Sequence, residues 1–231
     1  MQIDDSSLQA LLATWPLPTL SVAMLAWVAS QRPWRLLRQE PLQHAWLGGL
    51  VFLTLLWSAR ATVGTGVVVQ LMGAPLAVTM FGLPLAMLTL AVVDLVSLLG
   101  LAYLAGQGWA DIAWVSMAPR FIWMAVVPGV LTAGLQAVMR RRLPRHPFIF
   151  ILGHGYFAPL VAAIVAGSLR TLWQFHLGPP HAGLTIGDSL TGAVVIGFGE
   201  AFLTGMLVAI FVVYRPQWVL TFTDEDYLTG K

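Results

Sequence analysis

The chain is 231 residues long, and 58% of them are hydrophobic whereas only 10% are charged. Its mean hydropathy is +0.80, and a soluble domain would carry about 25% charged residues, so the composition excludes a soluble globular protein. The formal net charge of +2 does not indicate nucleic-acid binding, because the positive residues are sorted by loop rather than spread over one face.

Several missing residue types and motifs narrow the function further. The chain has no cysteine, which excludes disulfides, thiolate metal sites and cysteine nucleophiles. Its only lysine is Lys231, so it has no P-loop, and transport driven by ATP would need a separate ATPase subunit. The HExxH and G-x-S-x-G motifs of metalloproteases and hydrolases are also missing. We therefore expect a multi-pass membrane protein that is not an enzyme.

The first residues do not resemble a cleaved signal peptide. They carry Asp4 and Asp5 in place of a basic region, and Pro16 and Pro18 interrupt the apolar run that follows. We expect Met1 to be the mature amino terminus and to be exported with the first helix.

Six apolar runs predict helices. They cover residues 17–30, 42–59, 83–105, 121–139, 148–170 and 189–214. A hydrocarbon core needs about 20 apolar residues, so the first run either uses residues 8–15 as a lead or folds back into the bundle. Trp46 and Trp57, near the two ends of the second run, are typical of interfacial anchors.

Between the second and third runs, residues 63–81 are apolar but interrupted. Gly64, Gly66, Gly73 and Pro75 break this segment. Such irregular backbone is tolerated at membrane depth only where it is buried in protein or lines a cavity. Counted as a full crossing, the segment brings the prediction to an all-α bundle of seven spans, within a single membrane domain over residues 1–231.

The basic residues then predict the orientation. With seven spans, one side of the membrane receives Arg32, Arg35, Arg38, Arg140, Arg141, Arg142, Arg145, Arg215 and Lys231. The other side receives only Arg60, Arg120 and Arg170. The positive-inside rule places the amino terminus outside and the carboxyl terminus in the cytoplasm, across the inner membrane. Residues 217–231 form a short acidic cytoplasmic tail, which is either a docking segment or a frayed end.

The last run contains a carboxylate beside a stripe of small residues. Glu200 lies near its midpoint, where a charge is costly and needs a structural or a functional reason. Thr204 follows one turn later on the same strip. A small residue at every fourth position predicts close packing against another helix, and this stripe consists of Ala193, Gly197, Ala201, Gly205 and Ala209. We expect Asp188 to be the N-cap of this helix.

Two further polar residues fall inside predicted spans. Asp94 is central in its run, where it either shares a cavity and a proton with Glu200 or makes an unrelated polar contact. His154 lies about 10 Å into the membrane, as a packing residue or as part of a substrate pathway.

The end of the chain carries a family signature. It reads Gly199-Glu200-Ala201, then Leu203-Thr204-Gly205-Met206, and closes on Val213-Tyr214-Arg215-Pro216. Together with the broken segment over residues 64–82, this pattern resembles the cobalt and nickel energy-coupling-factor permeases of the CbiM/NikM type. The likeness is strongest to their short proteobacterial branch. The resemblance implies the substrate-binding membrane component of an ABC transporter, with an ATPase and a coupling membrane subunit as partners.

The same resemblance implies a metal site with altered ligands. In that family the exported amino terminus folds into the bundle, and its amine, the second residue and a histidine of the broken segment bind a divalent cation. The matching positions here are Met1, Gln2 and Gln70, so amides replace two imidazoles, and amides are poor ligands for Ni²⁺ or Co²⁺. Such a metal ion would be the substrate, and no intrinsic cofactor is expected.

Three functions stay open on the sequence. The leading hypothesis is a permease component whose substrate pathway uses Met1, Gln2, Gln70, Asp94, His154, Glu200 and Thr204. The second is a membrane scaffold or assembly factor that kept the fold and lost the metal ligands. The third is a proton-coupled carrier that uses Asp94 and Glu200.

Overall fold

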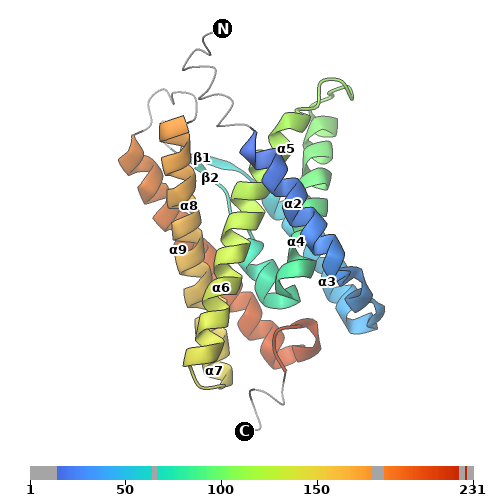
Figure 1. Cartoon of the computed structure of the whole chain (residues 1–231), viewed down its shortest axis with the longest axis vertical. Coiled ribbons are helices and arrows are strands. Elements are labelled where there is room, and N and C mark those ends of the chain that lie inside the picture. Colours follow the sequence, from blue (N-terminus) through green and yellow to red (C-terminus); the bar gives the residue numbers. More distant parts are fainter. Residues whose placement is uncertain (1–14, 64–66, 178–184, 224–226, 228–231) are drawn as a thin grey trace.

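Helices make up most of the chain, and most of them run roughly along the long axis of the molecule (Figure 1). The computed structural model describes residues 15–63, 67–177, 185–223 and 227. The longer helices are α2 (Pro16–Gln31), α3 (Glu40–Ser58), α4 (Ala74–Leu104), α6 (Val127–Arg142), α8 (Ala158–Leu177) and α9 (Ile186–Tyr214). The shorter helical elements are η1 (Pro33–Arg38), η2 (Trp114–Ser116), α5 (Met117–Phe121), η3 (Ile122–Val126), α7 (Pro147–Ile149), η4 (Phe150–Phe157) and η5 (Pro216–Trp218). Two short strands, β1 (Ala61–Val63) and β2 (Val67–Val69), pair antiparallel.

Four helical stretches of the described chain are long and apolar enough to cross a membrane. They are Ala74–Leu104, Trp114–Arg142, Pro147–Leu177 and Ile186–Tyr214. This confirms a multi-pass membrane protein built mainly of helices. The helices α2 and α3, which were also expected to cross, contain 16 and 19 residues. The count of seven spans and the orientation of the termini stay predictions.

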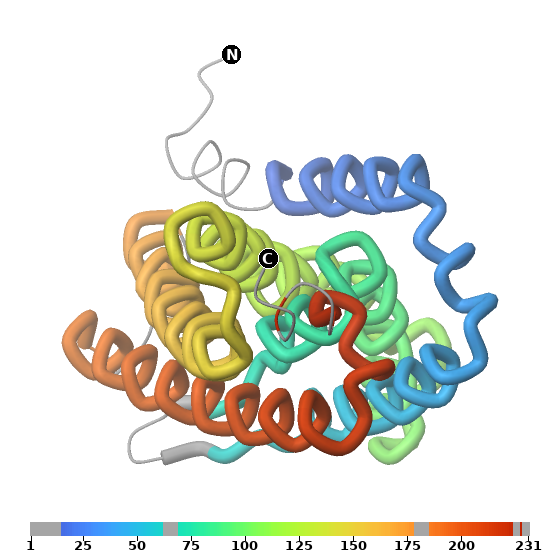
Figure 2. The backbone as a smooth tube through the Cα atoms, turned by 90° about the horizontal axis from the view of Figure 1, so that it is seen from below, coloured from blue at the N-terminus to red at the C-terminus, as the bar shows by residue number. Residues whose placement is uncertain are grey.

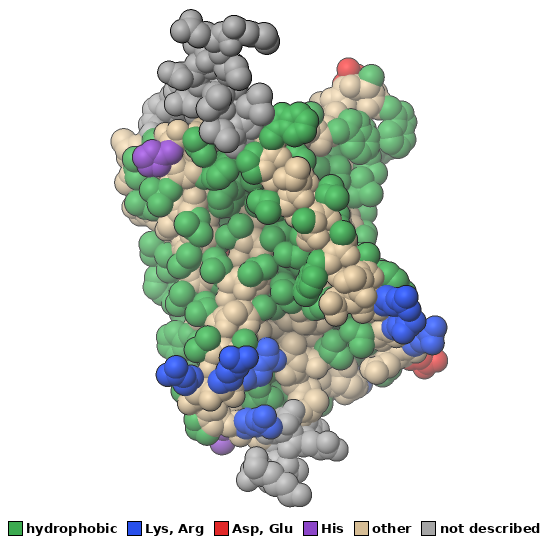
Figure 3. All heavy atoms as spheres, viewed as in Figure 1, with side chains coloured by type: hydrophobic (Ala, Val, Ile, Leu, Met, Phe, Trp, Pro, Cys, Tyr) green, Lys and Arg blue, Asp and Glu red, His purple; other side chains and the backbone are tan. Residues whose placement is uncertain are grey.

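Lys and Arg side chains gather toward the lower end of the face shown in Figure 3. Basic residues close α6 at Arg140–Arg142 and η1 at Arg35 and Arg38. Above them, the visible surface is largely apolar along the helices. This is the sorting of charge from which the orientation was predicted.

Over its described residues, the broken segment contains β2, which pairs with β1 just before the segment, and then a short buried helix. We call residues Ala74–Phe81, the first eight residues of α4, the half-helix. It ends at Gly82, whose backbone has φ 71° and ψ 162°, a conformation that is essentially restricted to glycine. Pro84 follows as one of the first residues of the second helical segment, where its missing N–H costs no hydrogen bond. At about 1.5 Å per residue the half-helix rises only about 12 Å, which is less than half of a hydrocarbon core.

The half-helix lies in the centre of the bundle. Every residue from Met72 to Phe81 is buried, and α3, α8, α9 and η4 all contact α4. Seen from below in Figure 2, the end of the chain crosses beneath this part of α4. Over residues 72–81, the expected enclosure of the broken segment by protein is therefore what the structure shows.

The remaining helices differ from the prediction mainly at their ends. The stretch from Trp114 to Arg142 is helical through the proline at position 128. The π-helical turn η3 ends two residues before this proline, and π-turns and prolines both interrupt the regular hydrogen bonding of a long helix. At the start of α9 the predicted N-cap is wrong by three residues. Thr185 is the N-cap, and Asp188 completes a capping box, with Asp188 N donating to Thr185 Oγ1 over 3.1 Å and Thr185 N donating to Asp188 Oδ2 over 3.2 Å.

Candidate transport site at the broken segment

Glu200 binds the amino-terminal end of the half-helix. Its side chain is fully buried, and its Oε1 accepts hydrogen bonds from the backbone N–H groups of Met72 and of Gly73, the second over 3.0 Å. Gly73 is the N-cap residue of α4. A carboxylate at this position satisfies free amide donors and lies at the positive end of the helix dipole. The acid in the middle of α9 therefore holds the broken segment in place.

Trp57 fixes the other side of the same turn. Its indole Nε1 donates to Met72 O over 2.6 Å, and its own carbonyl accepts from Gln70 Nε2 over 2.6 Å. Trp57 is 0% exposed, so its expected role as an interfacial anchor is wrong, because its N–H is used inside the protein. Gln70, Met72 and Glu200 are thus brought together at one end of the half-helix.

The carboxyl-terminal end of the half-helix is bound by the tail of the chain. Leu220 N donates to Met80 O over 2.7 Å, and Thr221 Oγ1 donates to Thr79 O. Because the helix stops at Gly82, these carbonyls have no partner further along α4. Glu200, which lies before the end of α9, therefore binds one end of the half-helix. Leu220 and Thr221, which lie after the end of α9, bind the other end.

A third contact reaches the half-helix from α6. Gln136 Nε2 donates to Thr79 Oγ1 over 2.7 Å and to His154 O over 3.2 Å. Gln136 is 1% exposed and Thr79 is 0% exposed. This amide therefore joins α6, η4 and the half-helix through buried hydrogen bonds, and such bonds make the packing of a core more specific.

Asp94 and Arg120 form an ion pair beside Trp57, in which Asp94 is buried and Arg120 is largely buried. Arg120 Nε lies 3.3 Å from Asp94 Oδ1, and the two side chains are 15% and 1% exposed. Arg120 Nη2 donates to Ser97 Oγ over 2.8 Å, and its guanidinium carbon lies 5.8 Å from the ring centre of Trp57. In the described chain Asp94 and Glu200 thus have separate partners, a guanidinium for Asp94 and two backbone amides for Glu200.

The other candidate residues of the pathway lie close to these contacts. His154 is 2% exposed, and its ring centre lies 4.9 Å from that of Phe150. Within the described chain, His154 Nδ1 and Thr204 Oγ1 are buried without a hydrogen-bond partner. Met1 and Gln2 lie outside the described residues. Among the residues that are described, there is no group of three or more His, Cys, Asp or Glu that could hold a metal ion.

The small-residue stripe of α9 lies against α8 and η4. A Cβ added at Gly197 would lie 2.5 Å from Ile164 Cγ1, and the Cα of Gly205 lies close to Gly155. Ala193 and Ala201 are buried, whereas Ala209 is half-buried. This close backbone contact turns Glu200, on the neighbouring strip, toward the half-helix.

Several residues of the site escaped prediction from the sequence. Arg120 was read as a helix-end arginine, and Gln136 carried no signal because a polar residue near the end of an apolar run is common. The tail residues Leu220 and Thr221 lie in a short segment with no periodic pattern. The free carbonyl groups at Gly82 were the available signal, because a helix that ends inside a membrane needs donors from elsewhere.

A discontinuous helix enclosed in a multi-pass bundle is typical of membrane transport proteins. The model of the CbiM family, described as the cobalt uptake substrate-specific transmembrane region, matches residues 5–218. The chain therefore belongs to the CbiM family, which consists of transporter membrane components rather than enzymes. No curated protein sequence matches the chain.

Proposed function

We propose that this chain is the substrate-binding membrane component of an energy-coupling-factor-type ABC transporter for a divalent transition-metal ion, cobalt or nickel. One observation carries the proposal. In a chain of the cobalt-uptake family, the buried Glu200 holds the turn at Met72 and Gly73, and Gln70 lies directly before that turn. An ATPase and a coupling membrane subunit would supply the driving force, since the chain has no P-loop of its own.

The contact of Gln70 limits how it can bind a cation. Its amide nitrogen donates to Trp57 O over 2.6 Å, so the amide oxygen is the atom that remains for a metal ion. Oxygen ligands favour harder cations than imidazole does. The terminal amine of Met1 and the side chain of Gln2 would complete the ligand set, as in the family pattern. We therefore expect weaker and less selective binding of cobalt and nickel than a site with two histidines would give.

Isothermal titration calorimetry of the purified protein tests the cation claim. We expect Co²⁺ or Ni²⁺ to bind the natural chain weakly and the double variant Gln2→His with Gln70→His more tightly. Binding that is missing in both proteins would remove the cation claim. Binding by the double variant alone would favour the scaffold hypothesis, in which the fold is kept and the ligands are lost.

Co-purification separates the transporter from the two other functions. A transporter component should bring an ATPase and a second membrane subunit, whereas a scaffold should bring another membrane complex and no ATPase. The partners of Asp94 and Glu200 favour the transporter over a proton-coupled carrier, because an ion pair and two backbone amides already occupy the two carboxylates. Uptake that follows a pH gradient, needs no ATP and is lost in Glu200→Gln would establish the carrier instead.

A further inference from the structure

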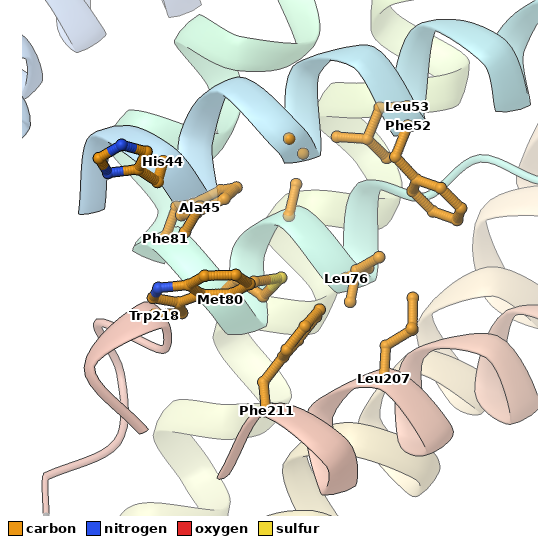
Figure 4. A pocket seen from close by; sticks show the side chains of 13 residues that line it. His44, Ala45, Phe52, Leu53, Leu76, Met80, Phe81, Leu207, Phe211 and Trp218 are labelled. Carbon is orange, nitrogen blue, oxygen red and sulfur yellow. The ribbon is translucent and has the colours of Figure 1, made fainter. Parts of the chain in front are cut away.

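An apolar crevice lies between α3 and α9, and the half-helix forms its floor. Its cavity volume is about 240 Å³. Phe52 comes from α3, Met80 from the half-helix, and Leu207 and Phe211 from α9, while Trp218 of η5 closes one end (Figure 4). His44 carries the one ionisable side chain of the lining. An isolated polar or charged ligand would find almost no partner in this crevice.

The crevice is open along α3. Gly48 belongs to its lining and is exposed, and a Cβ added there would meet nothing within 4 Å. On either side the surface is apolar, since Val51 of α3 is 58% exposed and Ile210 of α9 is 43% exposed. The crevice is therefore continuous with an exposed apolar surface of α3 and α9, and an exposed apolar surface of a membrane protein is expected to face lipid or another protein.

The crevice is long, and an arginine lies three residues before the tryptophan at one of its ends. Its lining follows α3 from His44 to Leu53, which corresponds to about 13 Å along the helix axis. At the end with His44 and Trp218, the exposed Arg215 lies directly after α9 and its carbonyl accepts from Trp218 N over 2.9 Å. Tryptophan and arginine at the end of an apolar surface are typical of the headgroup region, and arginine there attracts anionic lipids.

We propose that this crevice binds one acyl chain of an anionic phospholipid. The acyl chain of the lipid lies along α3 and against the half-helix. The lipid headgroup lies beside Arg215 and His44. The apolar lining and its direction along the helices match the acyl chain of this ligand. Arg215, near one end of the crevice, matches its anionic headgroup. Because the lipid would touch Met80 and Phe81, it would complete the packing of the half-helix on the side that faces the crevice. The inference does not depend on the identity of the transported ion.

Filling the crevice tests the proposal. The variant Gly48→Leu places a side chain in the open space, and Gly134→Leu on α6 is a matched control, because an added Cβ there also meets nothing within 4 Å and Gly134 is not part of the lining. Each protein is reconstituted into nanodiscs of phosphatidylcholine and phosphatidylglycerol, released in mild detergent and examined by native mass spectrometry. We expect a retained phosphatidylglycerol on the natural chain and on Gly134→Leu, and its loss on Gly48→Leu.

A second variant tests the headgroup. Arg215→Gln should keep a bound lipid but lose the preference for phosphatidylglycerol over phosphatidylcholine. Equal lipid retention by Gly48→Leu and the natural chain would overturn the proposal. So would a Gly48→Leu protein that keeps its lipid and loses a co-purifying membrane subunit, because a side chain of that subunit would then be the occupant. Metal binding measured on the same samples keeps this result separate from the test of the proposed transport function.

Discussion

At the scale of single residues, Glu200 of α9 caps the amino-terminal end of the half-helix, which belongs to α4. It is fully buried and accepts hydrogen bonds from two backbone amides that no other described residue satisfies. The same contacts explain why a carboxylate is tolerated at this depth, since charge-assisted hydrogen bonds are roughly twice as strong as neutral ones. In this interpretation the structural and the functional roles of Glu200 coincide, because the turn that it holds is the turn next to Gln70.

The variant Glu200→Ala should strongly destabilise the protein. It leaves two buried N–H groups without an acceptor, at a cost of about 1–3 kcal/mol each. Glu200→Gln keeps one carbonyl oxygen and should lose less. Thr204→Val is the control, because its buried hydroxyl has no partner in the described chain and its loss should leave the unfolding temperature unchanged or raise it. Thermal unfolding in detergent measures all three, and an unchanged unfolding temperature for Glu200→Ala would contradict the capping role.

The ion pair of Asp94 and Arg120 should show strong coupling. Asp94→Asn leaves the guanidinium, which is 15% exposed, without its counter-charge, and we expect a loss somewhat below the about 3–5 kcal/mol that breaking a fully buried pair costs. Adding Arg120→Gln to Asp94→Asn should recover part of that loss. A double-mutant cycle of unfolding free energies checks this expectation. Strictly additive effects of the two variants would show that the pair contributes nothing as a pair.

At the scale of elements, the half-helix is the part of the fold that departs most from a plain bundle. It is eight residues long, all eight residues are buried, and α3, α6, α9 and the tail contact it or the turn directly before it. Short helices are marginal on their own, so tertiary contacts supply its stability. Gly82 allows α4 to break. The residues that bind the two ends of the half-helix then keep the break in a single conformation.

A pair of glycine variants on α4 tests this view. Gly82→Ala should destabilise the protein by about 1–3 kcal/mol, because alanine is strained at φ 71° and ψ 162°, although its Cβ would meet nothing within 4 Å. Gly100→Ala, which is exposed, helical and equally free of contacts, should stabilise α4 by about 0.5–1 kcal/mol. Equal effects of the two variants on the unfolding temperature would show that α4 does not need a break at Gly82.

The long helices were predictable from the sequence, and the contacts of the half-helix were not. Apolar runs and the glycine and proline residues at 73, 75 and 82 indicate where helices lie and where one of them breaks. The partners of the break follow from tertiary packing, which leaves little local signal. Arg120 and Trp57 show this, since each has the sequence pattern of a residue near the membrane boundary while the structure pairs them inside the bundle.

At the scale of the whole molecule, the last part of the chain joins the two ends of the half-helix. Glu200 binds the end beside Gln70, while Leu220 and Thr221 bind the other end. Phe222 and Tyr227 of the tail pack against Phe150, with ring centres 5.1 Å away in each case. The tail, which the sequence left open between docking and fraying, is docked over the residues that the structure describes.

The tail should therefore contribute to the stability of the membrane domain. Thr221→Val removes a donor to a carbonyl of the half-helix, and a loss of about 1–3 kcal/mol is expected when that acceptor stays buried. Thr191→Val on α9 is the matched control, because its hydroxyl is exposed and bonds only to a carbonyl of its own helix. An unfolding temperature that falls equally in both variants would show that the tail contact is not specific.

Uptake in cells tests the proposed function most directly. Cells without other cobalt transport would express this chain together with its co-purifying ATPase and coupling subunit, and the cobalt that they accumulate would be measured. We expect accumulation with the complete set, and loss of it when the ATPase is inactivated or when Glu200 is replaced by alanine. Cobalt uptake that persists with an inactive ATPase, or that is missing from the complete set, would contradict the account.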